Sequence, residues 1–119
     1  MKKRIIIGVA MAVLICATAY AQSFVNSSGS KTATATIFGD AGKLHGIVVS
    51  TDGTNAQTVD IYDNTTNSGT KLIPTWIVTT SATDRTQSIS FYPPVNFNTG
   101  CHVVVSGSGA MSYIVYYSR

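Results

Sequence analysis

Short runs in which apolar and polar residues alternate, separated by clusters of turn-forming residues, make up the chain from residue 32 to residue 117. Alternation puts one side of the chain in a core and the other in solvent, which is typical of β-strands, and no helical spacing interrupts it. The predicted strands span residues 32–38, 44–50, 58–63, 71–78, 88–92, 101–105 and 111–117. About seven or eight strands in so short a chain indicate one all-β domain, an antiparallel β-sandwich of either immunoglobulin-like or jelly-roll topology.

Three of these runs indicate where the core lies. Residues 44–50 are apolar on both faces, so we expect this strand at the centre of a sheet. Val59 and Ile61 alternate with polar neighbours and are expected to point inward. The run 113–117 is apolar or aromatic on both faces, so it must be central in the fold or covered at a subunit interface.

Prolines and glycines divide the runs. Pro74 cannot donate to a sheet, so the strand around it is expected to be an edge strand or to bulge there, with Trp76 facing the core or covering the open edge. Pro93-Pro94 is expected to end the strand before it. Gly107-Ser108-Gly109 predicts a tight hairpin between the last two strands.

The start of the chain has the three parts of a secretory signal peptide. The cationic segment Lys2-Lys3-Arg4 precedes an apolar run over residues 5–17, and Ala19-Tyr20-Ala21 supplies the small residues that signal peptidase accepts. We expect a helical leader that is cleaved between Ala21 and Gln22. The apolar run is shorter than the roughly 20 residues that cross a bilayer, so retention as an uncleaved anchor is the alternative. The expected organisation is a signal peptide over 1–21, an N-terminal extension over 22–31 and the β-sandwich domain over 32–119.

Cleavage of this leader changes the charge of the chain. The precursor has eight basic and five acidic residues and a formal net charge of +3, but three of the basic residues lie in the leader. Those that remain are scattered singly and balance the aspartates. Because nucleic-acid binding needs a cluster of Lys and Arg on one face, we expect no nucleic-acid partner.

Cys101 is the cysteine that remains after cleavage, so the mature chain cannot form an internal disulfide. Next to a valine run, it is expected to be a buried small hydrophobic residue. An exported domain without a disulfide suits a bacterial periplasm, a cell surface or an extracellular particle.

No residue pattern indicates catalysis or metal binding. His45 and His102 lie in predicted strands without a Gly-x-Ser-x-Gly turn nearby, and glutamate is absent from the chain. Asp60 and Asp63 have opposite parity in an extended strand, so their carboxylates would not pair as in a glycosidase. The histidines and cysteine lack zinc-site spacing. We therefore expect a protein that is not an enzyme and has no cofactor or metal; a hydrolase that uses His45 or His102 is the least supported alternative.

Aromatic residues are the remaining candidates for a binding site. Tyr62, Tyr92 and Tyr116, together with Trp76, would offer a platform on which a sugar ring stacks. The competing interpretation is packing between neighbouring strands, which commonly uses aromatic residues.

Several of the strand and turn segments resemble small β-sandwich proteins of tailed bacteriophages. The likeness extends from Gly42 to Tyr117 and is carried by residues 44–49, 59–65, 68–74, 91–95, 99–103 and 113–117. The resemblance implies a virion structural or decoration-type protein and transfers no functional residue. The signal peptide departs from this pattern, because phage heads and tails assemble in the cytoplasm.

These observations together predict an exported, non-catalytic structural or surface-binding module that acts in multiple copies. Its expected partners are further copies of itself or a larger assembly, such as a virion, a filament or a cell surface. It would meet a membrane only through the leader before cleavage. The alternatives are a secreted carbohydrate-binding module with a glycan partner, or an adhesin or filament subunit.

Overall fold

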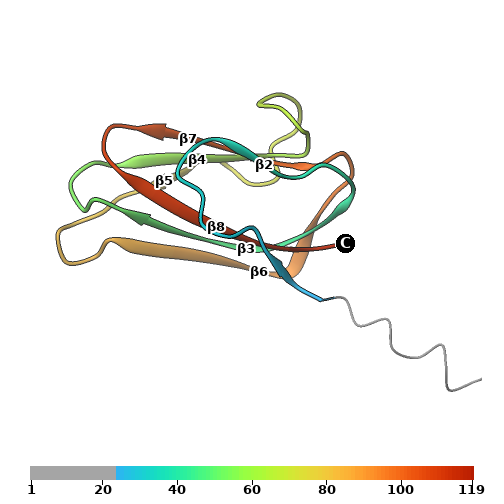
Figure 1. Cartoon of the computed structure of the whole chain (residues 1–119), viewed down its shortest axis with the longest axis horizontal. Coiled ribbons are helices and arrows are strands. Elements are labelled where there is room, and N and C mark those ends of the chain that lie inside the picture. The colour runs from blue at the N-terminus through green and yellow to red at the C-terminus, as the bar shows by residue number, and fades with distance from the viewer. Residues whose placement is uncertain (1–23) are drawn as a thin grey trace, which may run out of the picture.

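The computed structural model describes residues 24–119, which form two antiparallel sheets of four strands each and contain no helix (Figure 1). The strands are β1 (Asn26–Ser27), β2 (Ala35–Phe38), β3 (Gly42–Thr51), β4 (Gln57–Tyr62), β5 (Trp76–Val78), β6 (Thr86–Phe97), β7 (Cys101–Gly107) and β8 (Met111–Ser118). The expectation of an antiparallel all-β fold is confirmed. The predicted signal peptide and its cleavage point between Ala21 and Gln22 lie outside the described residues. Over residues 24–119, no helix has the length and apolar character needed to span a membrane.

The two sheets have the same number of strands and a corresponding strand order. Sheet A has the strand order β1-β8-β3-β6, and sheet B has the order β2-β7-β4-β5; they lie one above the other in Figure 1, with sheet B uppermost. The first strand pairs with the eighth, the second with the seventh, the third with the sixth and the fourth with the fifth. A long antiparallel ribbon folded across itself gives this pairing. Apart from β4 and β5, consecutive strands therefore lie in different sheets.

The core lies between the sheets and takes inward side chains from both. Val59 and Ile61 are fully buried, as the alternation in β4 predicts, and they share one cluster with buried residues of the opposite sheet. The cluster consists of Leu44, Ile47, Val49, Val59, Ile61, Ile73, Val78, Phe97, Cys101, Val103, Tyr113 and Val115. β3 lies between β8 and β6, and β8 lies between β1 and β3, so the predicted central position of both strands is confirmed.

β6 continues through Pro93-Pro94, and the expectation that the two prolines end this strand is wrong. Its register with β3 shifts, because Gly46 lies opposite Ser90 whereas Leu44 lies opposite Val95. The intervening residues of β6, including both prolines, therefore form a bulge. Proline is tolerated there because β6 is an edge strand and bulged residues do not need to donate to the neighbouring strand.

The connection Gly107-Ser108-Gly109 is not a tight hairpin, because β7 belongs to sheet B and β8 to sheet A. The segment instead crosses from one sheet to the other. Gly107 and Gly109 have φ angles of 143° and 101°, in a region that residues with side chains rarely adopt. Glycine in a turn predicts a change of direction but carries no information about which strands pair.

The remaining predicted strands differ in their limits. β5 begins at Trp76, so Pro74 lies in the loop before it; β5 is an edge strand, as expected, and Trp76 is half-buried against the core. β2 starts at Ala35, three residues into the predicted run. Within the segment expected to be an N-terminal extension, β1 pairs with β8 and Lys31 forms a bridge to Tyr113, so this segment lies along the edge of sheet A.

Candidate functional site

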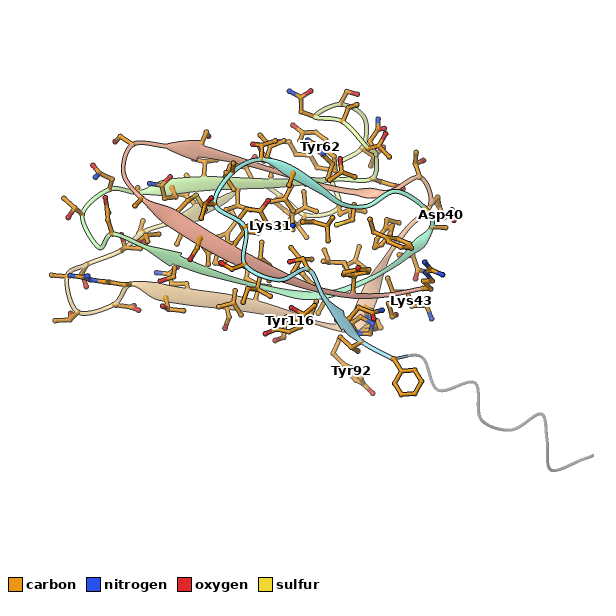
Figure 2. The ribbon with its side chains drawn as sticks, in the orientation of Figure 1. Lys31, Asp40, Lys43, Tyr62, Tyr92 and Tyr116 are labelled. Carbon is orange, nitrogen blue, oxygen red and sulfur yellow. The ribbon has the colours of Figure 1, made fainter. Side chains whose placement is uncertain are left out.

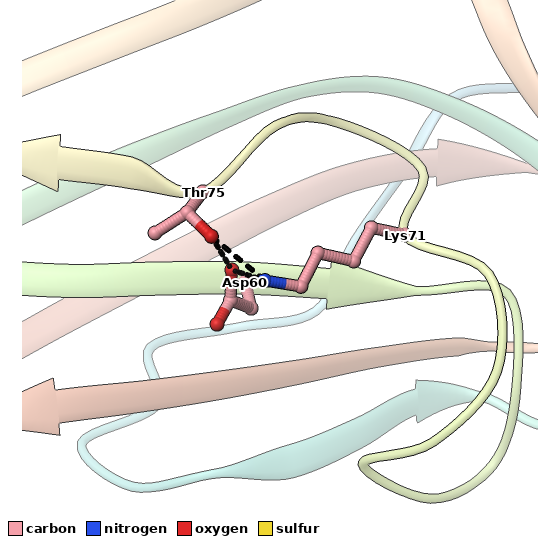
Figure 3. A network of polar contacts seen from close by, with 3 residues as sticks. All are labelled: Asp60, Lys71 and Thr75. Atoms are coloured by element: carbon pink, nitrogen blue, oxygen red, sulfur yellow. Dashed lines mark hydrogen bonds and ion pairs between the residues drawn. The ribbon is translucent and has the colours of Figure 1, made fainter.

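A cluster of three polar side chains lies on the outer side of sheet B (Figure 3). Asp60 comes from β4, and Lys71 and Thr75 come from the loop between β4 and β5. The Lys71 Nζ atom donates to Asp60 Oδ1 at 2.8 Å and to Thr75 Oγ1 at 2.7 Å, and the Thr75 hydroxyl donates to Asp60 Oδ1 at 2.6 Å. The Lys71 ammonium also lies 5.7 Å from the centre of the Tyr62 ring. These contacts fasten the loop to the sheet.

The protonation states of this cluster suit a structural role. Burial acts to raise the pKa of Asp60, but hydrogen bonds from Lys71 and Thr75 and the charge of Lys71 outweigh it and hold the pKa below its usual value. The hydrogen bond to Asp60 in turn raises the pKa of Lys71. A general acid needs a carboxyl pKa that is raised toward neutrality, and here the shift has the opposite direction.

Asp63 holds the turn between β6 and β7. Its carboxylate accepts hydrogen bonds from the backbone N–H groups of Asn98, Thr99 and Gly100, the first two at 2.9 and 2.7 Å. Burial acts to raise the pKa of Asp63, but these backbone donors lower it below its usual value. Asp60 and Asp63 thus have separate partners; β4 ends at Tyr62, so the alternation expected of a strand that continues to Asp63 does not apply. The two carboxylates share no hydrogen-bond partner.

Both histidines contact hydroxyl groups. His45 Nε2 lies 2.9 Å from Ser118 Oγ, and Ser118 is fully buried, so this hydroxyl is closed to a substrate. His102 Nδ1 lies 2.9 Å from Thr36 Oγ1, which donates its single hydrogen to the carbonyl oxygen of Thr65. Nδ1 of His102 is therefore the donor in its contact with Thr36. Within residues 24–119, no carboxylate hydrogen-bonds either imidazole ring.

Cys101 lies in the core and has no exposed surface. Burial, with a smaller contribution from the charge of Asp63, raises the pKa of its thiol to about 12. The thiol is therefore protonated and inaccessible at neutral pH, which confirms the expectation of a buried hydrophobic residue.

The three tyrosines proposed as a sugar-binding platform do not meet. Figure 2 shows Tyr62 on the side of sheet B, whereas Tyr92 and Tyr116 lie on the side of sheet A. Tyr92 is completely exposed in the bulge of β6, and Tyr116 is 37% exposed on β8. Trp76 packs against the core from the edge of sheet B. A hollow of about 430 Å³ opens elsewhere, beside the start of β2, and none of these four aromatic residues lines it.

The outer face of sheet A has a central area without charged side chains. The inward positions of its three long strands are identified by buried residues such as Ile47 and Val115, so alternate residues point outward. The outward residues form three rows across β8, β3 and β6: Tyr116, Gly46 and Ser90; Ile114, Val48 and Ser88; and Ser112, Ser50 and Thr86. No outward residue in these rows is charged. Among Lys, Arg, Asp and Glu, these strands contain only Lys43, which lies near the start of β3.

The edge of this face is equally bare. β6 has 12 residues and none is charged, and it pairs with β3 on one side only. Sheet B ends instead in the short strands β2 and β5, of 4 and 3 residues. Natural proteins usually protect a long edge strand with charges, prolines or bulges, since its unpaired backbone groups can bind another strand. In β6 the prolines and the bulge lie in the second half, and residues 86–90 have none of these features. The alternation in this run predicts the strand itself, whereas its place at an edge depends on long-range pairing.

The described residues 24–119 contain no group of three or more His, Cys, Asp or Glu side chains that could hold a metal ion. Comparison of the chain with protein-family models, with curated proteins and with solved structures gives no match.

Proposed function

We propose that this protein is a non-catalytic structural module that is exported through its N-terminal signal and works in multiple copies. The single observation that carries the proposal is the outer face of sheet A, which combines three rows of uncharged side chains with a long open edge. A solvated face that functions alone normally carries charges of both signs. A face without them does not repel copies of itself, and it suits packing inside a larger assembly.

The strand order supports a jelly-roll β-sandwich as the finer description of the fold. Immunoglobulin-like constant domains combine a sheet of four strands with one of three, and the sheets hold different sets of neighbours. Here both sheets have four strands, and four of the six pairs join strands whose numbers sum to nine, β1 with β8 through β4 with β5, while β3 with β8 and β4 with β7 complete the sheets. Eight strands in two Greek keys are the jelly-roll arrangement, which occurs in viral capsid proteins and lectins. This is an analogy of fold, and the function rests on the surface.

The resemblance to virion structural and decoration-type proteins of tailed bacteriophages agrees with this proposal. An exported copy of such a module would act at the cell envelope, outside the cell or in a particle assembled across the membrane. The N-terminal residue of the protein purified from expressing cells tests the export step. We expect Gln22, and an intact Met1 would show that the leader is retained.

Light scattering coupled to size exclusion, together with negative-stain microscopy of the same protein, tests the assembly. We expect species larger than one chain, or chains bound to an envelope or particle. A strict monomer that binds no envelope or particle contradicts the proposal.

A second candidate function, binding of a glycan, is favoured by the complete exposure of Tyr92. A tyrosine ring without packing partners is available for stacking on a sugar. A glycan array tests this candidate with Tyr92→Ala as the variant and Tyr62→Ala, on the other sheet, as the control. Loss of a glycan signal with Tyr92→Ala alone would support it, and an array without signal would exclude it.

A further inference from the structure

The backbone of β6 has one side bonded to β3 and one side free. The N–H of Thr51, at the end of β3, donates to the carbonyl oxygen of Arg85, just before β6, at 2.8 Å. Bonded pairs in an antiparallel ladder recur at every second residue, so the next ones are Val49 with Gln87 and Ile47 with Ile89. The backbone groups of Gln87 and Ile89 therefore point toward β3.

The backbone groups of the alternate residues of β6 point away from β3. The N–H and C=O groups of Thr86, Ser88 and Ser90 face the free edge, where β6 pairs with no strand of residues 24–119. All three residues are exposed. Their side chains are small hydroxyls on the outer face of sheet A. The three residues thus offer a short, regular row of unpaired donors and acceptors.

The charge distribution favours a second copy of the chain at this edge. β6 has no charged residue, and Arg85, which precedes it, has its Nε atom turned back to the carbonyl oxygen of Ala82 at 3.3 Å. Over residues 24–119, the five aspartates are balanced by Lys31, Lys43, Lys71, Arg85 and Arg119, so two copies carry no net charge into contact. A strongly charged partner would find no complementary group along the edge.

We propose that two copies of the chain pair antiparallel through β6, about a two-fold axis that passes beside Ser88. This register places Ser88 opposite Ser88 of the second copy and Thr86 opposite Ser90, so each free donor meets a free acceptor. The three pairs supply roughly six backbone hydrogen bonds, two for each pair. The two A sheets become one continuous sheet whose outer face is uncharged along the joined strands. The inference rests on the proposed function, because it names the contact through which copies associate.

Two variants of Ser88, one with a positive and one with a negative side chain, test both the pairing through β6 and its two-fold symmetry. In Ser88→Lys, two ammonium groups would lie opposite each other, and in Ser88→Asp two carboxylates would do so. We expect sedimentation velocity of the protein from cells expressing the full chain to show a dimer. Each variant alone should raise its dissociation constant roughly tenfold or more. An equal mixture of the two variants should recover the dimer, because each lysine then faces an aspartate.

Two further variants separate backbone pairing from a general surface effect. Ser88→Pro removes an N–H that points to the free edge and leaves the bonds to β3 intact, so it should abolish the dimer while the circular dichroism spectrum stays unchanged. Ser112→Lys adds the same charge to the same face on β8, away from the edge, and should leave the dimer intact.

The outcomes distinguish this inference from the broader proposal. Wild-type protein that stays monomeric at all concentrations but binds an envelope or particle overturns the β6 pairing alone. So does a dimer or larger assembly that Ser88→Lys, Ser88→Asp and Ser88→Pro leave unchanged. A monomer that binds neither overturns both.

Discussion

The two sheets are built from the same kind of alternating strand, but they differ in the side-chain contacts on their outer faces and in the length of their edge strands. The exterior of sheet B contains hydrogen bonds between side chains: Asp60 accepts from Lys71 and Thr75, and His102 contacts Thr36. The edges of sheet B are the short strands β2 and β5. Sheet A has no charged residue in the three outward rows across β8, β3 and β6, although Lys43 lies near the start of β3, and it has an open edge on β6. The strands of each sheet contain one charged residue, Lys43 in sheet A and Asp60 in sheet B, so the clearer difference is at the edges, where sheet A ends in the long strand β6. This open edge suits a neighbouring strand.

The largest expected effect is a difference in the free energy of unfolding between proline variants at two neighbouring positions of β6, Ile89 and Ser88. Ile89→Pro removes an N–H that faces β3 and also core packing, so we expect the free energy of unfolding to fall by about 3 kcal/mol or more. Ser88→Pro removes an N–H that faces the open edge, and the loss should stay within about 1 kcal/mol. Urea denaturation at a protein concentration low enough to keep the chain monomeric measures both. Equal losses would show that the orientation assigned to β6 is wrong.

A smaller effect is expected at the turn that Asp63 holds. Asp63→Ala leaves the backbone N–H groups of Asn98 and Thr99 without their acceptor, and we expect a loss of roughly 1–3 kcal/mol. Asp84→Ala, at an exposed loop carboxyl, should change stability by less than about 0.5 kcal/mol. Thermal denaturation of both variants and the wild type gives the comparison. If the two variants lose equal stability, the Asp63 turn does not contribute as the contacts indicate.

The loss of stability at low pH should come from protonation of carboxyl groups that lie outside the strands of sheet A. The pKa values of Asp52, Asp60 and Asp63 are all lowered from a usual value of 3.8, because hydrogen bonds to their carboxylates outweigh the effect of burial. A carboxyl whose pKa is lower in the folded state stabilises the fold above its unfolded pKa, and this contribution is lost as the pH falls through the folded pKa.

We therefore expect the Tm to be nearly constant from neutral pH to about pH 5 and to fall progressively below about pH 4. Calorimetry over this range measures it, and Asp63→Asn should make the decline shallower. A Tm that does not change down to about pH 2 would contradict the role given to these carboxylates.

The sequence predicts the content of the strands better than their arrangement. Alternation of apolar and polar residues correctly indicates that Val59 and Ile61 face the core, and an apolar run correctly indicates that residues 44–50 form a central strand. Both patterns are local, because the order of apolar residues along a strand reflects which of its faces are buried. These patterns cannot assign partners. Gly107-Ser108-Gly109 has the composition of a hairpin turn, yet it links two sheets, since pairing is decided by contacts far apart in the chain.

The same limit applies to the candidate sites. Tyr62 belongs to sheet B whereas Tyr92 and Tyr116 belong to sheet A, so the shared residue type suggests a platform of three rings that the fold does not form (Figure 2). Pro93-Pro94 reads as the end of a strand because the bulge opposite residues 44–46 is a tertiary feature. The unpaired edge of β6 has one local signal, a run of 12 residues without charge. Its significance emerges only when β6 is found at the edge of a sheet.

Hydrogen exchange of the β6 amides at increasing protein concentration tests the central claim most directly. The amides of Gln87 and Ile89 donate to β3 and should be protected at every concentration. Those of Thr86, Ser88 and Ser90 should exchange freely in dilute protein and become protected as the concentration rises and copies pair. Fast exchange at Ser88 and Ser90 at all concentrations, with unchanged protection at Gln87 and Ile89, would contradict the claim that sheet A is completed by a second chain.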